Sequence, residues 1–358
     1  MRKSELDTPF IAADIDTVKR NIARMQALAN SHGKNLRPHS KTHKLPSVAL
    51  WQVEAGAVGI CVQKTSEAEV MVNGGVSDVF VSNEVIGSQK TDRLAGLASR
   101  AKVSVAVDSE LGVRQLSQSA KSRGVEIDIY LDVDVGMHRC GMKLEKVASL
   151  AELVSKSSNI HLVGMMGYDG HSFRPLDSGE RRKIVDESRS ILQSAIREVS
   201  AKGIRLDVIS VGGTPSTPIW AEFDEVTELQ PGAYVYNDVM QVERGVSKAN
   251  CAVTLTGTVM SKPSSDQAVV DAGSKSFAFD FGRYPIPVGD VNGEVVGLSE
   301  EHAVLRSKGG PIRADLGDRL NFIPYHICTF IDLWDKIQLC HEDEVVSTLT
   351  IDARGART

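Results

Sequence analysis

Several reactive side chains in this sequence follow directly after apolar, strand-like runs. Lys41 is the first, and it lies in LRPHSKTHK with four further basic residues around it: Arg37, His39, His43 and Lys44. Neighbouring cations disfavour an ammonium ion and lower its pKa, which makes a lysine amine able to form a Schiff base. The segment therefore predicts a nucleophilic Lys41, with a solvated basic loop as the plain alternative.

Two glycine-containing segments could bind an anion through the backbone. SVGGTPST places Gly213 and Thr214 after an apolar run, and LQPGAYVYND places Gly232 and Tyr234 after the next one. Unhindered N–H groups and a hydroxyl suit a phosphate, and barrels often bind phosphate in the loops after their last two strands. The first segment is neither a P-loop nor a GxGxxG fingerprint, so a tight turn is the alternative. A lysine and a phosphate site on one barrel face together point to pyridoxal 5'-phosphate.

The pair His326 and Cys328, in PYHICTF, could bind a metal ion. If this segment is a strand, the two side chains point to the same side and could reach one ion. A thiolate with an imidazole favours zinc over manganese or magnesium. The alternative is a buried cysteine that packs as a small apolar residue beside a hydrogen-bonded histidine.

Three further residues that could do chemistry also follow strand-like runs. Arg139 lies in DVDVGMHRCGM, and Tyr168 and His171 lie in GYDGH. In a barrel of parallel strands, the residues after the carboxyl ends of the strands form the active site. We therefore expect these side chains at the same barrel face as Lys41.

Eight short runs rich in β-branched residues alternate with amphipathic segments over the first two thirds of the chain. The runs are 36–40, 59–63, 78–82, 103–107, 127–133, 161–166, 207–211 and 226–229. This alternation predicts parallel strands with right-handed crossovers, and runs such as VSVAV predict strands that are covered on both faces. The predicted fold is a (β/α)8 barrel of the TIM type, with a doubly wound open sheet as the alternative.

The pattern changes near residue 247, where strand-like runs begin to follow one another without helices between them. Turn-rich pieces such as SKGGPIRADLGD separate these runs, which predicts an antiparallel β domain. We predict a barrel domain over residues 11–246 and a β domain over residues 247–358, together with residues 1–10, that carries the metal pair. The apolar run PFIAAD near the N-terminus fits either domain.

Composition and charge exclude several classes of protein. The chain has 41 Lys+Arg against 46 Asp+Glu, and this net charge of -5 argues against partners such as nucleic acid or an anionic membrane. No apolar run approaches the roughly 20 residues that span a bilayer, and the N-terminal segment lacks the apolar core of a signal peptide. The five cysteines are scattered without a CxxC motif, which favours reduced thiols and a cytoplasmic location.

Taken together, these segments resemble the fold-type III pyridoxal-phosphate enzymes, which have an alanine-racemase-like barrel. Within them, the sequence is most similar to the D-serine dehydratase and D-threonine aldolase group. The resemblance covers nearly the whole chain and is carried by RPHSKTHK, DVDVGMHRCG, SVGGTPST, ELQPGAYVYND and PYHIC. The RPHxKTHK stretch with a late H-x-C is specific to the group.

The resemblance implies a role for each candidate residue. Lys41 matches the lysine that binds pyridoxal phosphate covalently, and Arg139 matches the arginine that faces the phenolic oxygen of the cofactor. Tyr168 and His171 match residues that line the cofactor and substrate. The phosphate-binding positions are Gly213, Thr214, Gly232 and Tyr234, and the positions for a divalent metal are His326 and Cys328. Tyr325 departs from the family, because relatives often have asparagine there, and this departure bears on the substrate.

The resemblance also implies a lyase that acts on a D-3-hydroxy amino acid. We expect dehydration of D-serine or D-threo-3-hydroxyaspartate to a 2-oxo acid and ammonia, because H-x-C resembles the dehydratases and hydroxide needs a Lewis acid to leave. Retro-aldol cleavage, as in D-threonine aldolase and with His171 as the base, is the main alternative. An amino-acid racemase and a non-catalytic protein that binds the cofactor are more distant alternatives. A homodimer is expected from the same resemblance.

Overall fold

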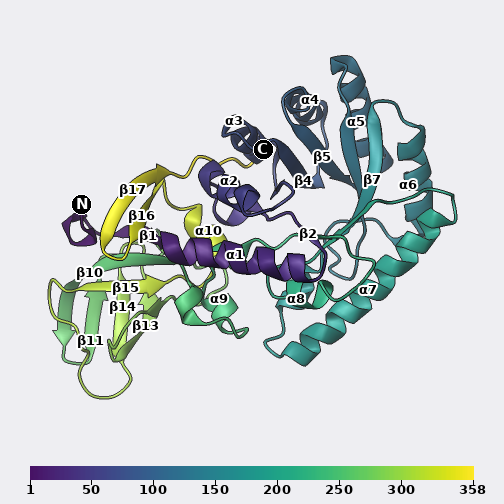
Figure 1. Ribbon diagram of the computed structural model, residues 1–358. Helices are drawn as coiled ribbons and strands as arrows, with labels where there is room; N and C mark the ends of the chain where they lie inside the picture. The colour runs from purple at the N-terminus through teal and green to yellow at the C-terminus, as the bar shows by residue number, and fades with distance from the viewer. The chain divides into compact units, whose positions relative to one another are not determined.

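The structure is a computed structural model that describes residues 1–358, and the chain divides into two compact units (Figure 1). The barrel unit comprises Ala23–Lys41, Leu45–Gly232 and Ala356–Thr358. The β unit comprises Met1–Ile22, Thr42–Lys44 and Ala233–Gly355. Each unit has its own sheet and is described by itself.

Eight parallel strands form the sheet of the barrel unit, in the order β2-β9-β8-β7-β6-β5-β4-β3. They are β2 (Asn35–Leu36), β3 (Ile60–Val62), β4 (Asp78–Glu84), β5 (Lys102–Val107), β6 (Ile127–Asp132), β7 (Ile160–Gly167), β8 (Val208–Val211) and β9 (Glu228–Leu229). The two edges meet beyond β2, where His39 forms a parallel bridge with Cys61 of β3. Each of the eight predicted runs overlaps one of these strands, so the predicted barrel is confirmed.

Helices follow the strands and form the outer layer of the barrel unit (Figure 1). They are α2 (Pro46–Glu54), α3 (Thr65–Asn73), α4 (Ser88–Leu97), α5 (Glu110–Arg123), α6 (Leu144–Lys156), α7 (Ser178–Ser200) and the short α8 (Thr217–Trp220). Their ends carry the expected signals. Ser109 caps α5 by accepting from the Gly112 N–H at 3.4 Å, and Gly124 ends it in the left-handed region at φ 63. Helix α1 (Ile15–Ser31) begins in the β unit and ends in the barrel unit.

The inside of the barrel is filled by side chains from successive strands. Phe80 of β4 stacks on Tyr130 of β6 with ring centroids 4.2 Å apart, and Met166 of β7 packs in the same cluster. The barrel is therefore a packed core rather than a pore, and its chemistry must lie at the strand ends.

The sheet of the β unit has the order β13-β14-β11-β10-β1-β16-β17, and β15 pairs with both β10 and β12. Its strands are β1 (Phe10–Asp14), β10 (Val253–Ser264), β11 (Gln267–Val270), β12 (Ile286–Pro287), β13 (Gly293–Leu298), β14 (Ala303–Ser307), β15 (Arg319–Ile323), β16 (Lys336–His341) and β17 (Glu344–Thr350). The pairs are antiparallel except β1 with β16, which is parallel. The apolar PFIAAD run, which fitted either domain, supplies strand β1 of this sheet.

Two short helices of the β unit were not expected from the sequence: α9 (Val239–Val242) and α10 (Ile327–Ile331). The second begins within PYHICTF, the segment considered above as a strand, because β15 stops at Ile323, directly before Pro324. Proline cannot continue the ladder as a donor. In the whole structure, no helix has both the length and the apolar character needed to cross a membrane.

Candidate active site

Lys41 lies in a turn of 3-10 helix, Ser40–Thr42, that follows the end of β2. Its backbone N–H donates to His39 Nδ1 at 3.2 Å, and His39 Nε2 lies 3.2 Å from both Gln63 Oε1 and Ser82 Oγ. These contacts hold the backbone of Lys41 against the ends of the neighbouring strands. The amine therefore projects from a fixed position at the carboxyl face of the barrel.

The basic residues around Lys41 do not act as free cations, which corrects the argument made from the sequence. Arg37 is buried, and its guanidinium donates to Glu228 at 2.8 Å and to Asp78 at 2.5 Å. Lys44 forms an ion pair with Asp332 at 3.4 Å. Because these charges are balanced by carboxylates, crowding by cations is not what would activate Lys41.

Tyr168 brings together two of the predicted site residues. The Lys41 ammonium lies 5.4 Å from the centroid of the Tyr168 ring, and the Arg139 guanidinium lies 5.2 Å from it. Both distances fall within the range of a cation–π interaction. The aromatic ring, the amine and the guanidinium thus form one cluster in the barrel unit, as the sequence predicted.

The loop of residues 134–142 holds Arg139 in this cluster. Met142 N–H donates to Asp132 O at 2.9 Å, and Gly141 N–H donates to the Asp108 carboxylate at 3.4 Å. Burial raises the pKa of Asp132, and its hydrogen bond to the Glu84 carboxyl raises it further. No motif in the sequence marks these three acidic residues, although each lies within two residues of the end of a predicted strand.

His171 follows β7 in a turn of 3-10 helix, Gly170–Phe173. Its Nε2 lies 3.4 Å from Ser188 Oγ, and its Nδ1 is buried without a hydrogen-bond partner. Burial lowers the pKa of His171, and the nearby Asp169 carboxylate offsets only part of that effect. The imidazole is therefore neutral near pH 7 and can accept a proton.

The predicted phosphate-binding glycines follow two adjacent strands. Gly213 and Thr214 follow β8, Gly232 follows β9, and Val211 of β8 is in register with Leu229 of β9. The Gly213 N–H donates to Ser216 Oγ at 3.1 Å, which closes a tight turn.

The turn at Gly213 belongs to the barrel unit, and the space beside its backbone is open. A Cβ atom at Gly213 would meet only the Tyr168 ring, at 3.8 Å, so the turn faces the same aromatic ring as Lys41. Tyr234 is buried in a short 3-10 helix, Ala233–Val235, of the β unit.

His326 and Cys328 lie together, but not on a strand. His326 is extended, with φ -126 and ψ 108, and occupies the N-cap position of α10 without a side-chain capping bond, and Cys328 lies in the first turn of that helix. The imidazole and the thiol form a side-chain hydrogen bond. Burial lowers the pKa of His326, but Cys328 and Asp280 outweigh it and raise the pKa to about 9. The strand alternation invoked from the sequence is therefore wrong, although the pairing itself is present.

Two residues that sequence analysis did not name contact this pair. The Asp280 carboxylate lies 2.6 Å from His326 Nδ1, and Thr42 Oγ1 lies 3.2 Å from Cys328 Sγ. Thr42 follows Lys41 directly in the chain. The late acidic residue in FAFDFG carried no recognisable motif, and only the fold brings it to His326.

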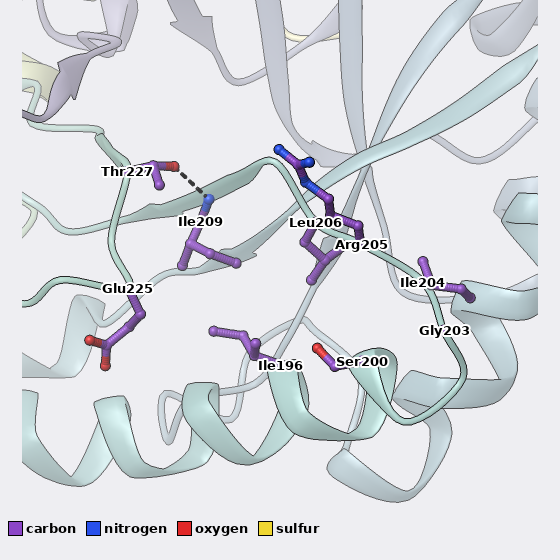
Figure 2. Close-up of a pocket in the computed structure, with 9 residues that line it drawn as sticks. All are labelled: Ile196, Ser200, Gly203, Ile204, Arg205, Leu206, Ile209, Glu225 and Thr227. Atoms are coloured by element: carbon purple, nitrogen blue, oxygen red, sulfur yellow. Dashed lines mark hydrogen bonds between the residues drawn. The ribbon is translucent and has the colours of Figure 1, made fainter.

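A surface groove in the barrel unit is not part of this site. It measures about 480 Å³ and is lined by the end of α7, the loop before β8 and the segment before β9 (Figure 2). Thr227 Oγ1 accepts from the Ile209 N–H at 2.9 Å within it. The groove lies at the amino end of β8, whereas the candidate residues follow the carboxyl ends of the strands.

The residues present fit both groups that the sequence predicts. Pyridoxal phosphate requires an amine, an anion-binding turn and polar groups around its ring, and Lys41, the turn at Gly213, Tyr168 and Arg139 supply them. The buried Nδ1 of His171 has no hydrogen-bond partner and could bond to a polar group of a ligand. A metal ion would find an imidazole and a thiol in contact at His326 and Cys328. No group of three or more His, Cys, Asp and Glu side chains is arranged as a metal site, so this pair supplies two donors.

Comparisons with known proteins identify the same two parts. Residues 13–239 match the family described as alanine racemase, N-terminal domain, and residues 252–340 match the putative serine dehydratase domain. A D-threonine aldolase of Arthrobacter sp is 34% identical over 98% of this chain and 94% of its own length. A 3-hydroxy-D-aspartate aldolase of Paracoccus denitrificans is 33% identical over 99% of this chain and 94% of its own length.

Solved structures of similar sequence have the same fold. The crystal structure of D-threonine aldolase from Filomicrobium marinum superposes with a TM-score of 0.94 at 30% identity, over 100% of this chain and 98% of that one. A cysteine-to-alanine variant of D-threo-3-hydroxyaspartate dehydratase in the metal-free form gives 0.88 at 27% identity, over 98% of both chains. A histidine-to-alanine variant of that enzyme gives 0.89 at 26% identity, over 98% and 96%.

The family match covers more than half of the chain, and the relatives are similar over nearly their whole length. The chain therefore belongs to the alanine-racemase-like, pyridoxal-phosphate-dependent lyases of D-hydroxy amino acids, the family of the D-threonine aldolases and D-serine dehydratases.

Proposed function

We propose that this lyase dehydrates a D-3-hydroxy amino acid, of the D-serine or D-threo-3-hydroxyaspartate type, to a 2-oxo acid and ammonia. The observation that carries the proposal is the placement of His326 at the N-cap of α10 and of Cys328 in the first turn of the same helix, where the two side chains interact. Hydroxide is a poor leaving group, and a Lewis acid beside the β-hydroxyl would stabilise the charge that develops on it. An imidazole and a thiolate are ligands that zinc prefers, with manganese and magnesium as less suited alternatives.

The dehydratase relatives support a metal at this pair. In D-threo-3-hydroxyaspartate dehydratase, structures exist for a histidine variant and for a cysteine variant in its metal-free form. This chain has a histidine and a cysteine two positions apart in its serine-dehydratase-like part. Two donors are too few for a closed structural site, and a catalytic metal needs open positions for substrate.

Residues that follow the barrel strands in the chain would bind the cofactor and move the α-proton. Pyridoxal phosphate, when bound, supplies an electron sink for negative charge at Cα. Lys41 would hold it covalently, Arg139 would face its phenolic oxygen, and Tyr168 would lie against it. The turn at Gly213 and Thr214, with Gly232 and Tyr234, would hold its phosphate. The Lys41 amine, once substrate has taken its place, is the group positioned to remove the proton from Cα.

Retro-aldol cleavage to glycine and an aldehyde is the second candidate, and two observations favour it. His171 is a half-buried imidazole with a lowered pKa and a buried Nδ1 without a hydrogen-bond partner, and it could take the proton of the β-hydroxyl. The two aldolase relatives share 34% and 33% of their residues with this chain over nearly its whole length. In this reaction the metal would acidify the hydroxyl rather than stabilise it as a leaving group.

One substrate distinguishes the two reactions. With D-threonine and zinc, dehydration yields 2-oxobutanoate and ammonia, whereas cleavage yields acetaldehyde and glycine. We expect 2-oxobutanoate as the main product, and acetaldehyde with glycine in equal amounts would overturn dehydration in favour of cleavage. L-Threonine is the control, and formation of L-allo-threonine from D-threonine, by inversion at Cα alone, would indicate a racemase.

We propose further that the enzyme is a cytoplasmic homodimer. All five cysteines are free thiols, which supports a reducing compartment. Phe279 and Phe281 of the β unit are exposed, at 42% and 54%, and large exposed aromatic side chains are typical of a contact surface. Light scattering after size exclusion should give twice the chain mass of 38.7 kDa. The single-chain mass at micromolar concentration would contradict the dimer.

A further inference from the structure

The imidazole of His326 is fixed on one side by two polar side chains of the β unit. Asp280 Oδ2 lies 2.6 Å from His326 Nδ1, and Thr329 Oγ1 lies 3.0 Å from the same nitrogen. A carboxylate accepts hydrogen bonds, so the ring hydrogen in this contact is on Nδ1. The other ring nitrogen, Nε2, is then the one left to bind a metal ion.

The Asp280 carboxylate is itself held in place. Its second oxygen, Oδ1, accepts from the Thr329 hydroxyl at 3.0 Å. The ring of Phe281, the next residue, packs edge-on against the His326 ring with centroids 5.1 Å apart. Asp280 and Phe281 therefore reach His326 from one segment, which restrains both the position and the tilt of the imidazole.

We propose that Asp280 is a positioning residue for the metal site, which fixes the Nδ1–H form of His326 so that Nε2 is free to bind the metal beside Cys328. Histidine ligands usually donate their other N–H to a carboxylate or carbonyl, which fixes the tautomer and makes the ligand a better donor. The site has only two protein donors, so few metal–ligand bonds offset the entropy lost when a side chain is ordered. Metal affinity therefore depends more on each ligand side chain being ordered before the metal binds. The inference rests on the metal pair of the proposed function and adds a residue to it.

Zinc affinity of the apo-protein tests this role without reference to turnover. Zinc is titrated into chelator-treated protein that retains pyridoxal phosphate, in competition with a chromophoric chelator at one fixed pH near neutrality. Loss of such an outer partner typically weakens metal binding about 10–100-fold. We expect Asp280→Ala to fall in this range and Asp280→Asn to lose less, because an amide oxygen can still accept from Nδ1–H. Thr329→Val should give a smaller loss still.

Asp315→Asn is the matched control. Asp315 is an exposed carboxylate of the same unit that pairs with Lys262 at 2.6 Å. Its substitution should leave zinc affinity unchanged, so a general effect of lost negative charge is separated from the effect of Asp280. Cobalt substituted for zinc reports whether Cys328 is still a ligand, through the absorption of a cobalt–thiolate bond. We expect this band to persist in Asp280→Ala at saturating cobalt.

The outcomes separate the inference from the function on which it rests. If Cys328→Ala binds zinc as tightly as the parent protein, the metal pair and the proposed dehydration both fail. If Cys328→Ala loses zinc but Asp280→Ala keeps the parent affinity, only the role of Asp280 is overturned. A loss in Asp280→Ala as complete as that in His326→Ala would make Asp280 a metal ligand and would equally overturn a positioning role.

Discussion

At the scale of single residues, Tyr168 connects the parts of the cofactor site. Its ring has the Lys41 ammonium and the Arg139 guanidinium within 5.4 Å and 5.2 Å of its centroid. The sequence could indicate these three residues because each follows a strand-like run. It could not show that Arg37 is neutralised by Glu228 and Asp78, because that depends on which strands are neighbours in the barrel.

Replacing Tyr168 by leucine should weaken cofactor binding about tenfold. Leucine fills part of the space but offers no aromatic face, and a cation–π contact contributes about 0.5–2 kcal/mol. Titration of the apo-enzyme with pyridoxal phosphate, followed by absorbance, measures the effect. Tyr168→Phe keeps the ring and should bind within about twofold of the parent protein. Equal weakening in both variants would assign the effect to the hydroxyl instead.

The pH dependence of turnover should follow His171 if it is the base. Burial holds the pKa of this imidazole below the ordinary value of 6.5, so it remains neutral as the pH falls through 7. The groups that face it are Asp169, Asp134, Arg174 and His138. Because folding favours the neutral form, the free energy of unfolding should also decrease as the pH falls below 6.5.

The measurement is kcat/KM with D-threonine across the acidic range. We expect a plateau that extends below pH 6.5 before activity falls, and the loss of this acidic limb in His171→Gln. A limb centred above 6.5, or one that is unchanged in His171→Gln, would exclude His171 as the base.

At the scale of elements, the strands were predictable and the helix of the metal pair was not. The eight barrel strands are buried and rich in β-branched residues, and this pattern can be recognised in the sequence, as VSVAV shows for β5. PYHIC looks like the continuation of β15, but Pro324 ends the strand, and the buried Asp238 carboxylate then accepts from the Ile327 N–H at 2.8 Å. This partner lies 89 residues away in the chain, beyond the reach of local patterns.

Asp238→Ala should destabilise the β unit by about 2–4 kcal/mol. The buried carboxylate accepts from the backbone N–H groups of Gln241, within α9, at 2.9 Å, and of Ile327, the first residue of α10, at 2.8 Å. Alanine leaves both donors unpaired in the interior, at about 1–3 kcal/mol each. Urea denaturation of the holoenzyme measures the change. A loss below about 0.5 kcal/mol would mean that water or a neighbouring group replaces the carboxylate.

Gly141→Ala should disturb the loop that presents Arg139. Gly141 has φ +93, and an added Cβ would lie 2.6 Å from the backbone nitrogen of Asp134. The loop must shift to relieve this clash, so cofactor affinity should fall at least about tenfold, which corresponds to about 1.4 kcal/mol. Gly124→Ala is the control, because Gly124 has a similar left-handed conformation with nothing within 4 Å of its Cβ position. Unchanged cofactor binding in Gly141→Ala would show that the loop does not fix Arg139.

At the scale of the whole molecule, the candidate groups divide between the two units. Lys41, Arg139, Tyr168 and His171 belong to the barrel unit, whereas His326 and Cys328 belong to the β unit. The sequence indicated this division, because the alternation of strands and helices ends before the H-x-C pair. The partner of the metal pair, Asp280, was not predictable, because it lies in a segment between strands with no pattern of its own.

Removal of the metal should therefore abolish turnover but leave the cofactor bound. Its proposed ligands are distinct from the residues that would hold pyridoxal phosphate. We expect chelator treatment to remove more than nine tenths of lyase activity while the absorbance of the bound cofactor persists, and added zinc to restore activity. Loss of cofactor together with the metal would show that the two sites depend on each other for binding.

The covalent attachment of pyridoxal phosphate to Lys41 is the claim on which the account depends most directly. Borohydride reduction of the holoenzyme, followed by digestion and mass spectrometry, locates the modified lysine. The account predicts a pyridoxyl group on the peptide that contains Lys41, and no cofactor retained after reduction of Lys41→Ala. A pyridoxyl group on another lysine, with Lys41 unmodified, would contradict it.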